Sequence, residues 1–108
     1  MALHAKIDAH FASLFASFVE KLRRSPDGDG SVLDHSLIVF GGGMSDGQAH
    51  SAYPLPLAAV GGANGRMKGN RFVMAGEWTP VANFWLSVAG MFGSSIEQFG
   101  ESNGRVTL

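Results

Sequence analysis

The 108-residue chain contains no cysteine, which removes disulfide bonds, thiolate metal sites and cysteine nucleophiles from its chemistry. It also lacks any apolar run near the ~18 to 20 residues that a membrane-spanning helix needs, so the sequence predicts no transmembrane segment. The first residues lack the layout of a signal peptide because Lys6, Asp8 and His10 interrupt the apolar positions. These absences leave the cell compartment undetermined.

An excess of charge of one sign is also missing. Eight Lys and Arg face nine Asp and Glu, for a net charge of −1. Most of the basic residues fall into two small groups, which are Lys21, Arg23 and Arg24, and Arg66, Lys68 and Arg71. A dedicated nucleic-acid surface needs clustered Lys and Arg to contact phosphates, so the charge balance predicts no nucleic-acid partner.

The composition that remains is that of a small globular protein. Hydrophobic residues make up 45% of the chain, and most of its 15 glycines fall between Gly41 and Gly76. No internal repeat or linker interrupts the sequence. We therefore expect one domain over residues 1–108, with a loop-rich middle and a small core.

Two amphipathic helices are predicted, one at each end. Apolar residues recur at steps of three and four from Leu3 to Leu22, and Pro26 predicts an end near Arg24. Thr79 is the expected N-cap of the second helix, with Pro80 at its first position and Gly93 closing it.

Two apolar segments between the helices, Leu37 to Phe40 and Leu55 to Val60, show no alternation of polar and apolar residues. Such runs are typical of strands buried on both faces in a parallel sheet. Turn signals after Gly61 predict a hairpin whose return strand is Arg71 to Met74. The predicted fold class is therefore α/β: a fragment of a mostly parallel sheet flanked by two amphipathic helices, with a glycine-rich loop and hairpin in the middle.

The densest group of reactive side chains follows the first predicted strand. Three glycines end the strand, and Ser45, Asp46 and His50 follow within a few positions. Ligands and metals bind beyond the carboxyl ends of strands in open sheets, and carboxylate and imidazole are common non-thiolate ligands of zinc. A divalent-metal site is one interpretation, although it needs a further ligand, for which His10, Asp34 and His35 are candidates. The alternative is a structural turn at Asp46 with His50 hydrogen-bonded to backbone.

Three other motifs are matched only in part. Gly43 to Gly47 fits the pattern G-x-S-x-G of a nucleophile elbow, but no helical pattern follows it. Asp27 to Gly30 resembles part of a calcium loop but lacks its twelfth-position Glu, which favours a solvated turn. Gly61 to Gly69 is glycine-rich without either nucleotide fingerprint, which favours a surface hairpin.

Segments over nearly the whole chain resemble, in the same order, the C-terminal region of the bacterial proteins classified as domain of unknown function 1552. These segments are Phe18 to Leu22, Ser25 to Gly30, Leu33 and Asp34, Ser36 to Phe40, Gly43 to Gly47, His50, Leu55 and Pro56, Gly61 and Gly62, Thr79 to Asn83, and Phe99 and Gly100. The resemblance implies a C-terminal part of a longer, exported protein. The expected partner is then a second copy, by self-association, or the N-terminal part of the same family protein.

That family is similar in arrangement to the alkaline-phosphatase and sulfatase superfamily. The resemblance implies a metal-dependent hydrolase-like protein for phosphate or sulfate esters, with Asp46 and His50 as ligands of zinc, manganese or calcium. It places Ser45 beside them and His10 on a helix histidine without an assigned role. The superfamily's nucleophile lies N-terminal to this sequence, so we expect this chain alone to be inactive. The alternative is a non-catalytic binding or structural role in the cell envelope.

Overall fold

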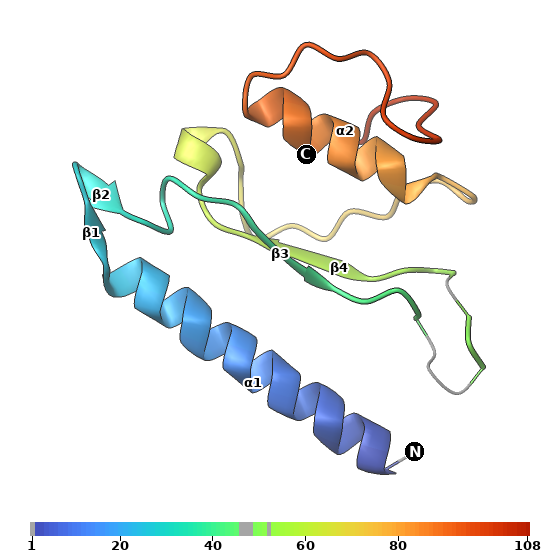
Figure 1. The fold of residues 1–108 in the computed structure, drawn as a ribbon, viewed down its shortest axis with the longest axis horizontal. Coiled ribbons are helices and arrows are strands. Elements are labelled where there is room, and N and C mark those ends of the chain that lie inside the picture. The colour runs from blue at the N-terminus through green and yellow to red at the C-terminus, as the bar shows by residue number, and fades with distance from the viewer. Residues whose placement is uncertain (1, 46–48, 52) are drawn as a thin grey trace. The chain divides into compact units, whose positions relative to one another are not determined.

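The computed structural model describes residues 2–45, 49–51 and 53–108 (Figure 1). The chain divides into two compact units, Met1–Asn64 and Gly65–Leu108. The first contains α1 (Ala2–Arg24), β1 (Pro26–Asp27), β2 (Gly30–Ser31), β3 (Ile38–Gly41) and β4 (Leu57–Val60). The short 3-10 helix η1 (Ala63–Gly65) ends at the boundary, and α2 (Val81–Met91) belongs to the second unit.

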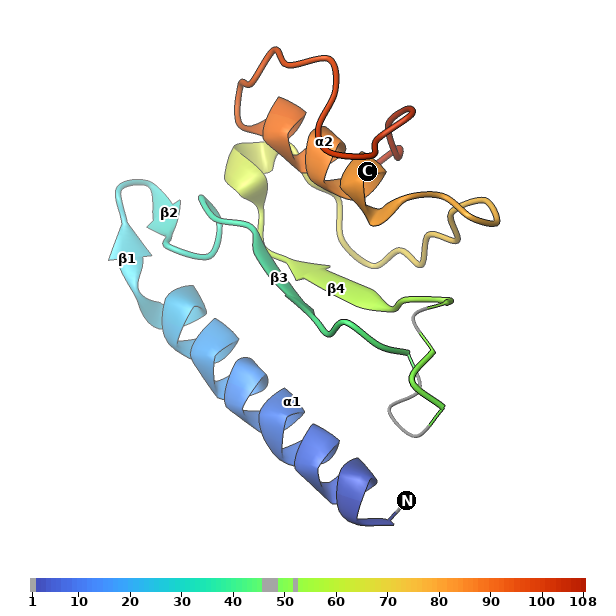
Figure 2. The ribbon, with the colours of Figure 1, turned by 45° about the vertical axis from the view of Figure 1, so that its right-hand side comes forward.

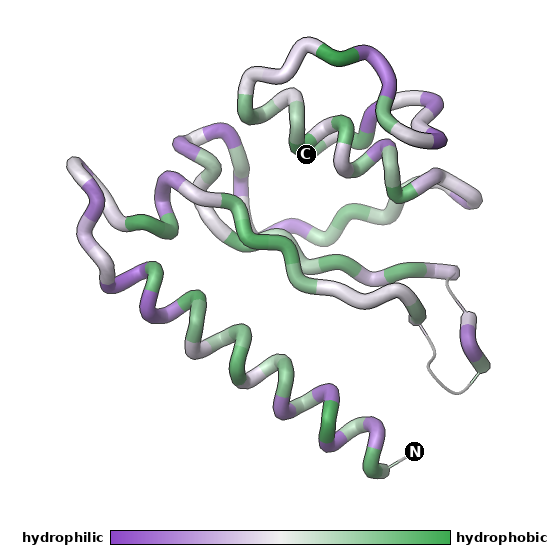
Figure 3. Tube along the Cα trace, in the orientation of Figure 1, coloured by the Kyte–Doolittle hydropathy of each residue, from purple (hydrophilic) through white to green (hydrophobic). Residues whose placement is uncertain are grey.

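Helix α1 confirms the predicted first helix, including its end at Arg24. Figure 3 shows hydrophobic and hydrophilic residues alternating along its length. The last turn is basic, which suits the negative end of the helix dipole, and Glu20 accepts hydrogen bonds from Arg23 and Arg24. The Ser25 hydroxyl then donates to the Lys21 carbonyl at 2.7 Å, which satisfies one of the helix's terminal acceptors.

A short β-hairpin, with two residues in each strand, follows α1 directly. Strands β1 and β2 pair antiparallel, and Gly28 sits in the turn between them with a φ of 61°, where glycine is favoured. Figures 1 and 2 both show this hairpin at the C-terminal end of α1. The turn predicted for residues 27–30 is therefore confirmed.

Strands β3 and β4 correct the predicted sheet. They pair antiparallel, from Ile38 opposite Val60 to Gly41 opposite Leu57, and the two sheets of the described residues each hold two antiparallel strands. The mostly parallel sheet is wrong for a topological reason. Parallel neighbours need a crossover connection that returns the chain to the starting end of the first strand, whereas β4 begins at the end where β3 stops, with Leu57 opposite Gly41. The residues of both strands are half-buried or exposed, so their lack of alternation does not reflect burial on two faces.

The end of β4 lies tightly against the turn that precedes β3. Amide groups of Gly62 and Ala63 donate to the carbonyls of Leu33 and Ser36 at 3.0 and 2.9 Å. A Cβ on Gly61 would overlap the Ser36 carbonyl oxygen, and one on Gly62 would overlap that of Asp34. These glycines therefore permit a close backbone contact that no larger residue allows.

In the second unit, α2 confirms the predicted second helix with a shift of one residue at its start. Pro80 is the N-cap, and the Thr79 hydroxyl donates to the Gly76 carbonyl rather than to the helix. Gly93, with a φ of 89°, follows the C-cap as expected, and Ser94 donates to the Ala89 carbonyl at 3.0 Å. Residues 71–74, all within the described part, form no strand, so the predicted return strand is wrong.

The core of the second unit forms where the C-terminal tail crosses α2. Leu86 is 1% exposed, and its carbonyl accepts a hydrogen bond from Arg105 at 2.8 Å. The Ser87 hydroxyl donates to the Val106 carbonyl at 2.7 Å and accepts from its amide at 2.8 Å. A polar side chain of α2 thus makes the main-chain hydrogen bonds of the extended tail that a neighbouring strand would make in a sheet. Across the described residues, neither helix is long and apolar enough to cross a membrane.

Candidate functional site

The candidate site lies in the loop that connects β3 to β4. Figures 1 and 2 place this loop at the end of the strand pair away from η1. Two glycines, Gly42 and Gly43, lead into it, and nothing lies within 4 Å of where their Cβ atoms would be. Of the three glycines only Gly41 is closely packed, since a Cβ there would overlap the Leu57 side chain.

The described part of the loop is closed by two serines. The amide of Ser45 donates to the Ser51 carbonyl at 2.7 Å, and its hydroxyl donates to the same oxygen at 3.1 Å. The Ser51 hydroxyl in turn donates to the Tyr53 carbonyl at 3.0 Å, next to a cis Tyr53–Pro54 peptide bond. Ser45 precedes Asp46 in the chain and Ser51 follows His50, so this contact joins the two ends of the segment that carries both predicted ligands.

The structure describes two of the three predicted loop residues, Ser45 and His50. Asp46 lies outside the described residues. His50 is exposed and has a φ of 54°, a left-handed conformation that is uncommon for residues other than glycine. Ser45 is exposed as well, and its hydroxyl is engaged by Ser51. The assignment of Asp46 and His50 as ligands therefore stays a prediction.

His10 lies on α1, where its ring packs against that of Phe11 with centroids 6.0 Å apart. Its carbonyl accepts a hydrogen bond from the Ser13 hydroxyl at 2.7 Å. No group of three His, Cys, Asp or Glu residues among those described is arranged to hold a metal ion.

A second cluster of titratable groups, which the sequence did not single out as a site, lies at the β1–β2 hairpin. The Nδ1 atom of His35 is 2.9 Å from Asp27 Oδ2, and its Nε2 atom is 3.3 Å from Asp29 Oδ1. Each ring nitrogen therefore faces a carboxylate, an arrangement that only the doubly protonated imidazolium satisfies on both sides. The hydrogen bond with Asp27 raises the pKa of His35 above its ordinary value, and the charges of Asp27 and Asp29 add to it, while burial acts in the opposite direction.

Asp34 positions His35 for these contacts. Its carboxylate accepts from the Ser31 amide at 2.8 Å, and its own amide is 3.2 Å from the Ser31 hydroxyl. The pKa of the Asp34 carboxyl is lowered first by the hydrogen bond from the Ser31 amide and then by the nearby Ser31 hydroxyl, with a further contribution from the charge of His35 and against the opposing effect of burial. The sequence signal for this cluster is an Asp-Gly-Asp-Gly turn followed closely by histidine, and it was considered only as a partial calcium loop. Its geometry stabilises a hairpin and shows no arrangement for binding a ligand.

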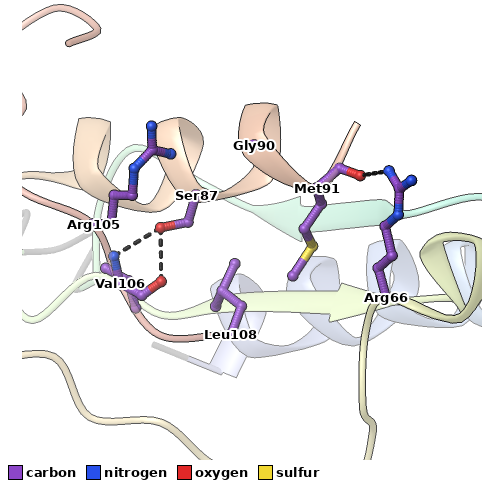
Figure 4. Close-up of a pocket in the computed structure, with 7 residues that line it drawn as sticks. All are labelled: Arg66, Ser87, Gly90, Met91, Arg105, Val106 and Leu108. Carbon is purple, nitrogen blue, oxygen red and sulfur yellow. Dashed lines mark hydrogen bonds between the residues drawn. The ribbon is translucent and has the colours of Figure 1, made fainter. Parts of the chain in front are cut away.

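The second unit has a shallow hollow of about 340 Å³, shown in Figure 4. Its lining is formed by Arg66, Ser87, Gly90, Met91, Arg105, Val106 and Leu108. Arg66 donates to the Met91 carbonyl, and Arg105 donates to the carbonyls of Leu86 and Ile96 at 2.8 Å each. Both guanidinium groups thus bind main-chain oxygens, including that of Met91 at the last residue of α2, which is a structural role.

Helix α1 presents the largest apolar feature of the first unit. None of its residues, all of which the structure describes, is buried. One side contacts the strands through Phe15, whose ring stacks on that of Phe40 at 4.7 Å between centroids. Beside this contact runs an exposed stripe of large side chains. We call it the α1 stripe, and it consists of Leu3, Ile7, Phe11, Leu14 and Phe18, which are 67, 45, 55, 52 and 49% exposed.

Comparisons of the chain with models of known protein families, with characterised proteins and with solved structures find no match.

Proposed function

We propose that this chain supplies a divalent-metal-binding loop to a hydrolase-like protein that acts on phosphate or sulfate esters, and that it is a C-terminal part of a protein of the domain-of-unknown-function 1552 family. The observation that carries the proposal is the closure of the loop by Ser45 and Ser51. It holds together the two chain positions from which Asp46 and His50 extend. The family part of the proposal rests on the segments of sequence resemblance.

The residue types in the loop fit a divalent cation. A carboxylate and an imidazole are both ligands of zinc and manganese, and backbone or serine oxygens add harder donors that calcium accepts. A cation bound here would polarise an ester oxygen and stabilise the charge that develops on it. In this proposal Asp46 and His50 bind the cation, and Ser45 fixes the shape of the loop through its two hydrogen bonds to Ser51.

The proposal is tested by isothermal titration calorimetry of the tag-free chain with Zn²⁺ and with Mn²⁺. We expect one bound ion, and we expect Asp46→Ala and His50→Ala each to weaken its affinity at least tenfold. Two variants of exposed α1 residues, Asp8→Ala and His4→Ala, remove the same side-chain types elsewhere and are expected to bind as the parent does. Undiminished binding in both loop variants would refute the assignment.

A second candidate function is non-catalytic binding or assembly, and the α1 stripe favours it. A large contiguous patch of exposed apolar surface is rare on a monomeric protein and typically marks an interaction site. In this proposal the chain self-associates, or packs against the N-terminal part of the same family protein, through this stripe. The mass of the chain in solution, measured by light scattering over a range of concentrations, tests self-association directly.

A further inference from the structure

We infer that the α1 stripe is a self-complementary surface through which two copies of this chain pair with their α1 helices antiparallel. This inference rests on the second candidate function, self-association, and adds its geometry. It comes from the order of the residues in the stripe rather than from its exposure alone.

The stripe reads nearly the same in both directions. Ile7 and Phe18 lie at equal distances from the midpoint between Ala12 and Ser13, and so do Phe11 and Leu14. Leu3 is matched in the same way by the half-buried Leu22, at the edge of the contact with the strands. At 3.6 residues per turn the five stripe residues fall within a sector about 80° wide. In two antiparallel copies, Ile7 of each copy therefore lies against Phe18 of the other, and Phe11 of each lies against Leu14 of the other.

Charge favours the antiparallel over the parallel pairing. Lys21 lies in the same sector as the stripe, beyond Phe18, and Arg23 and Arg24 follow it in the basic last turn. A parallel pair would bring two copies of this basic end together, and Lys21 would face its own copy. The antiparallel pair avoids this repulsion, because it places Lys21 opposite His4 and brings the basic end beside the N-terminal half, where the charges of Lys6 and Asp8 cancel. It also aligns the two helix dipoles favourably.

The area of the stripe suits a weak, reversible dimer. Its five side chains are about half exposed, which at roughly 170 Å² each leaves on the order of 450 Å² of apolar surface per copy. Pairing would cover about twice that area in total, before the stems of flanking polar residues are counted. This approaches the ~1,000 Å² that separates specific interfaces from incidental contacts. Because Phe15 already packs on Phe40, the stripe is free to meet a partner without opening the first unit.

Cysteine crosslinking tests the direction of pairing, and the natural absence of cysteine leaves a clean background. Variants Ile7→Cys and Phe18→Cys are prepared separately, mixed and oxidised gently. In an antiparallel pair, Ile7 and its copy are about 16 Å apart along the axis, too far for a disulfide, whereas Ile7 and Phe18 are adjacent. We expect the mixture to form mixed dimers at least tenfold faster than either variant alone forms homodimers. Ala9→Cys with Ala16→Cys, in the same register on the opposite face, is the control expected not to link.

Light scattering with Phe11→Glu separates this inference from the broader proposal. Phe11 is 55% exposed, so the charge is tolerated by the fold, and we expect the dimer to dissociate at least tenfold more readily, with Ala9→Glu unchanged. A chain that is monomeric at every concentration, or whose monomers bind lipid vesicles through the stripe instead, overturns both self-association and the α1 pairing. Self-association that survives Phe11→Glu overturns the α1 pairing alone. Rapid linking of Ile7→Cys by itself means a parallel pair and also overturns it.

Discussion

The side chain of Asn83 on α2 forms a reciprocal pair with Asn103 on the tail. Its amide nitrogen donates to Asn103 Oδ1 at 2.9 Å, and its Oδ1 accepts from the Asn103 main-chain amide, also at 2.9 Å. Asn83 is only 5% exposed, so these hydrogen bonds form largely out of water. One turn later, Ser87 binds the main chain of Val106 in the same manner. The two residues hold the extended tail to the helix without a sheet.

Removal of Asn83 is expected to loosen the tail. Asn83→Ala deletes both hydrogen bonds of the pair and should lower the free energy of unfolding by about 1–3 kcal/mol. Asn103→Ala keeps the main-chain amide that donates to Asn83, so it should cost about half as much. Urea unfolding of both variants measures the difference. An Asn103→Ala variant as unstable as Asn83→Ala would show that the main-chain hydrogen bond contributes little.

The core of the second unit depends on Leu86. At 1% exposure it is fully enclosed, and Leu86→Ala should lower the free energy of unfolding by about 2–5 kcal/mol. Val81, on the same helix but 45% exposed, provides the comparison, and Val81→Ala should cost less than about 1 kcal/mol. Thermal unfolding of the two variants followed by circular dichroism checks this. Equal effects would mean that Leu86 is not enclosed in solution.

Gly61 is expected to resist substitution at the junction after β4. Its φ of 123° is strained for any other residue, and an added Cβ would overlap the Ser36 carbonyl. Gly61→Ala should therefore destabilise the chain by more than about 1 kcal/mol. Gly42→Ala, where nothing lies within 4 Å of the added Cβ, should change stability by no more than about 0.5 kcal/mol. A neutral Gly61→Ala in chemical denaturation would contradict the close packing of this junction.

The stability of the β1–β2 hairpin should depend on pH through His35. Its pKa is raised in the folded chain by the facing Asp27 and Asp29, so the folded state binds the proton more tightly than the unfolded state. The resulting stabilisation is complete below the ordinary histidine pKa of about 6.5 and is lost as the pH rises through the higher folded value. Asp34 acts in the opposite sense, with a lowered pKa whose stabilisation disappears only in acid.

Unfolding experiments between pH 5.5 and pH 8.5 measure this effect. The parent chain should become less stable over the upper part of that range, and His35→Ala should remove most of the dependence. His4→Ala, which removes an exposed histidine of α1, is the control expected to keep it. The same slope in the His35→Ala variant would place the titrating group elsewhere.

Local signals in the sequence predicted local structure well. Pro26 marked the end of α1, and Gly93 marked the end of α2 because its left-handed conformation follows from the lack of a Cβ. Thr79 was assigned to the cap one residue early, since its hydroxyl finds the Gly76 carbonyl instead. The ends of the helices depend on residues within one or two helical turns, and these neighbours can be identified from the sequence alone.

Strand direction could not be predicted in the same way. The runs that form β3 and β4 look alike in either orientation, so the sequence does not reveal that Ile38 pairs with Val60 in an antiparallel sheet. The cluster of Asp27, Asp29 and His35 was missed for a related reason. It forms only because Asp34 binds Ser31 and turns the chain back toward the hairpin. Likewise, the contact of Ser45 with Ser51 has no signature in their sequence spacing.

We propose that one divalent cation binds in the loop between β3 and β4 through Asp46 and His50. Paramagnetic broadening by Mn²⁺ in the amide spectrum of the labelled chain tests it most directly, because the broadening falls off steeply with distance from the ion. The account predicts that substoichiometric Mn²⁺ broadens the amide signals of Ser45 and Ser51 first, and that Asp46→Ala abolishes this. Broadening centred on Asp27 and Asp29 instead, or no selective broadening anywhere, would contradict it.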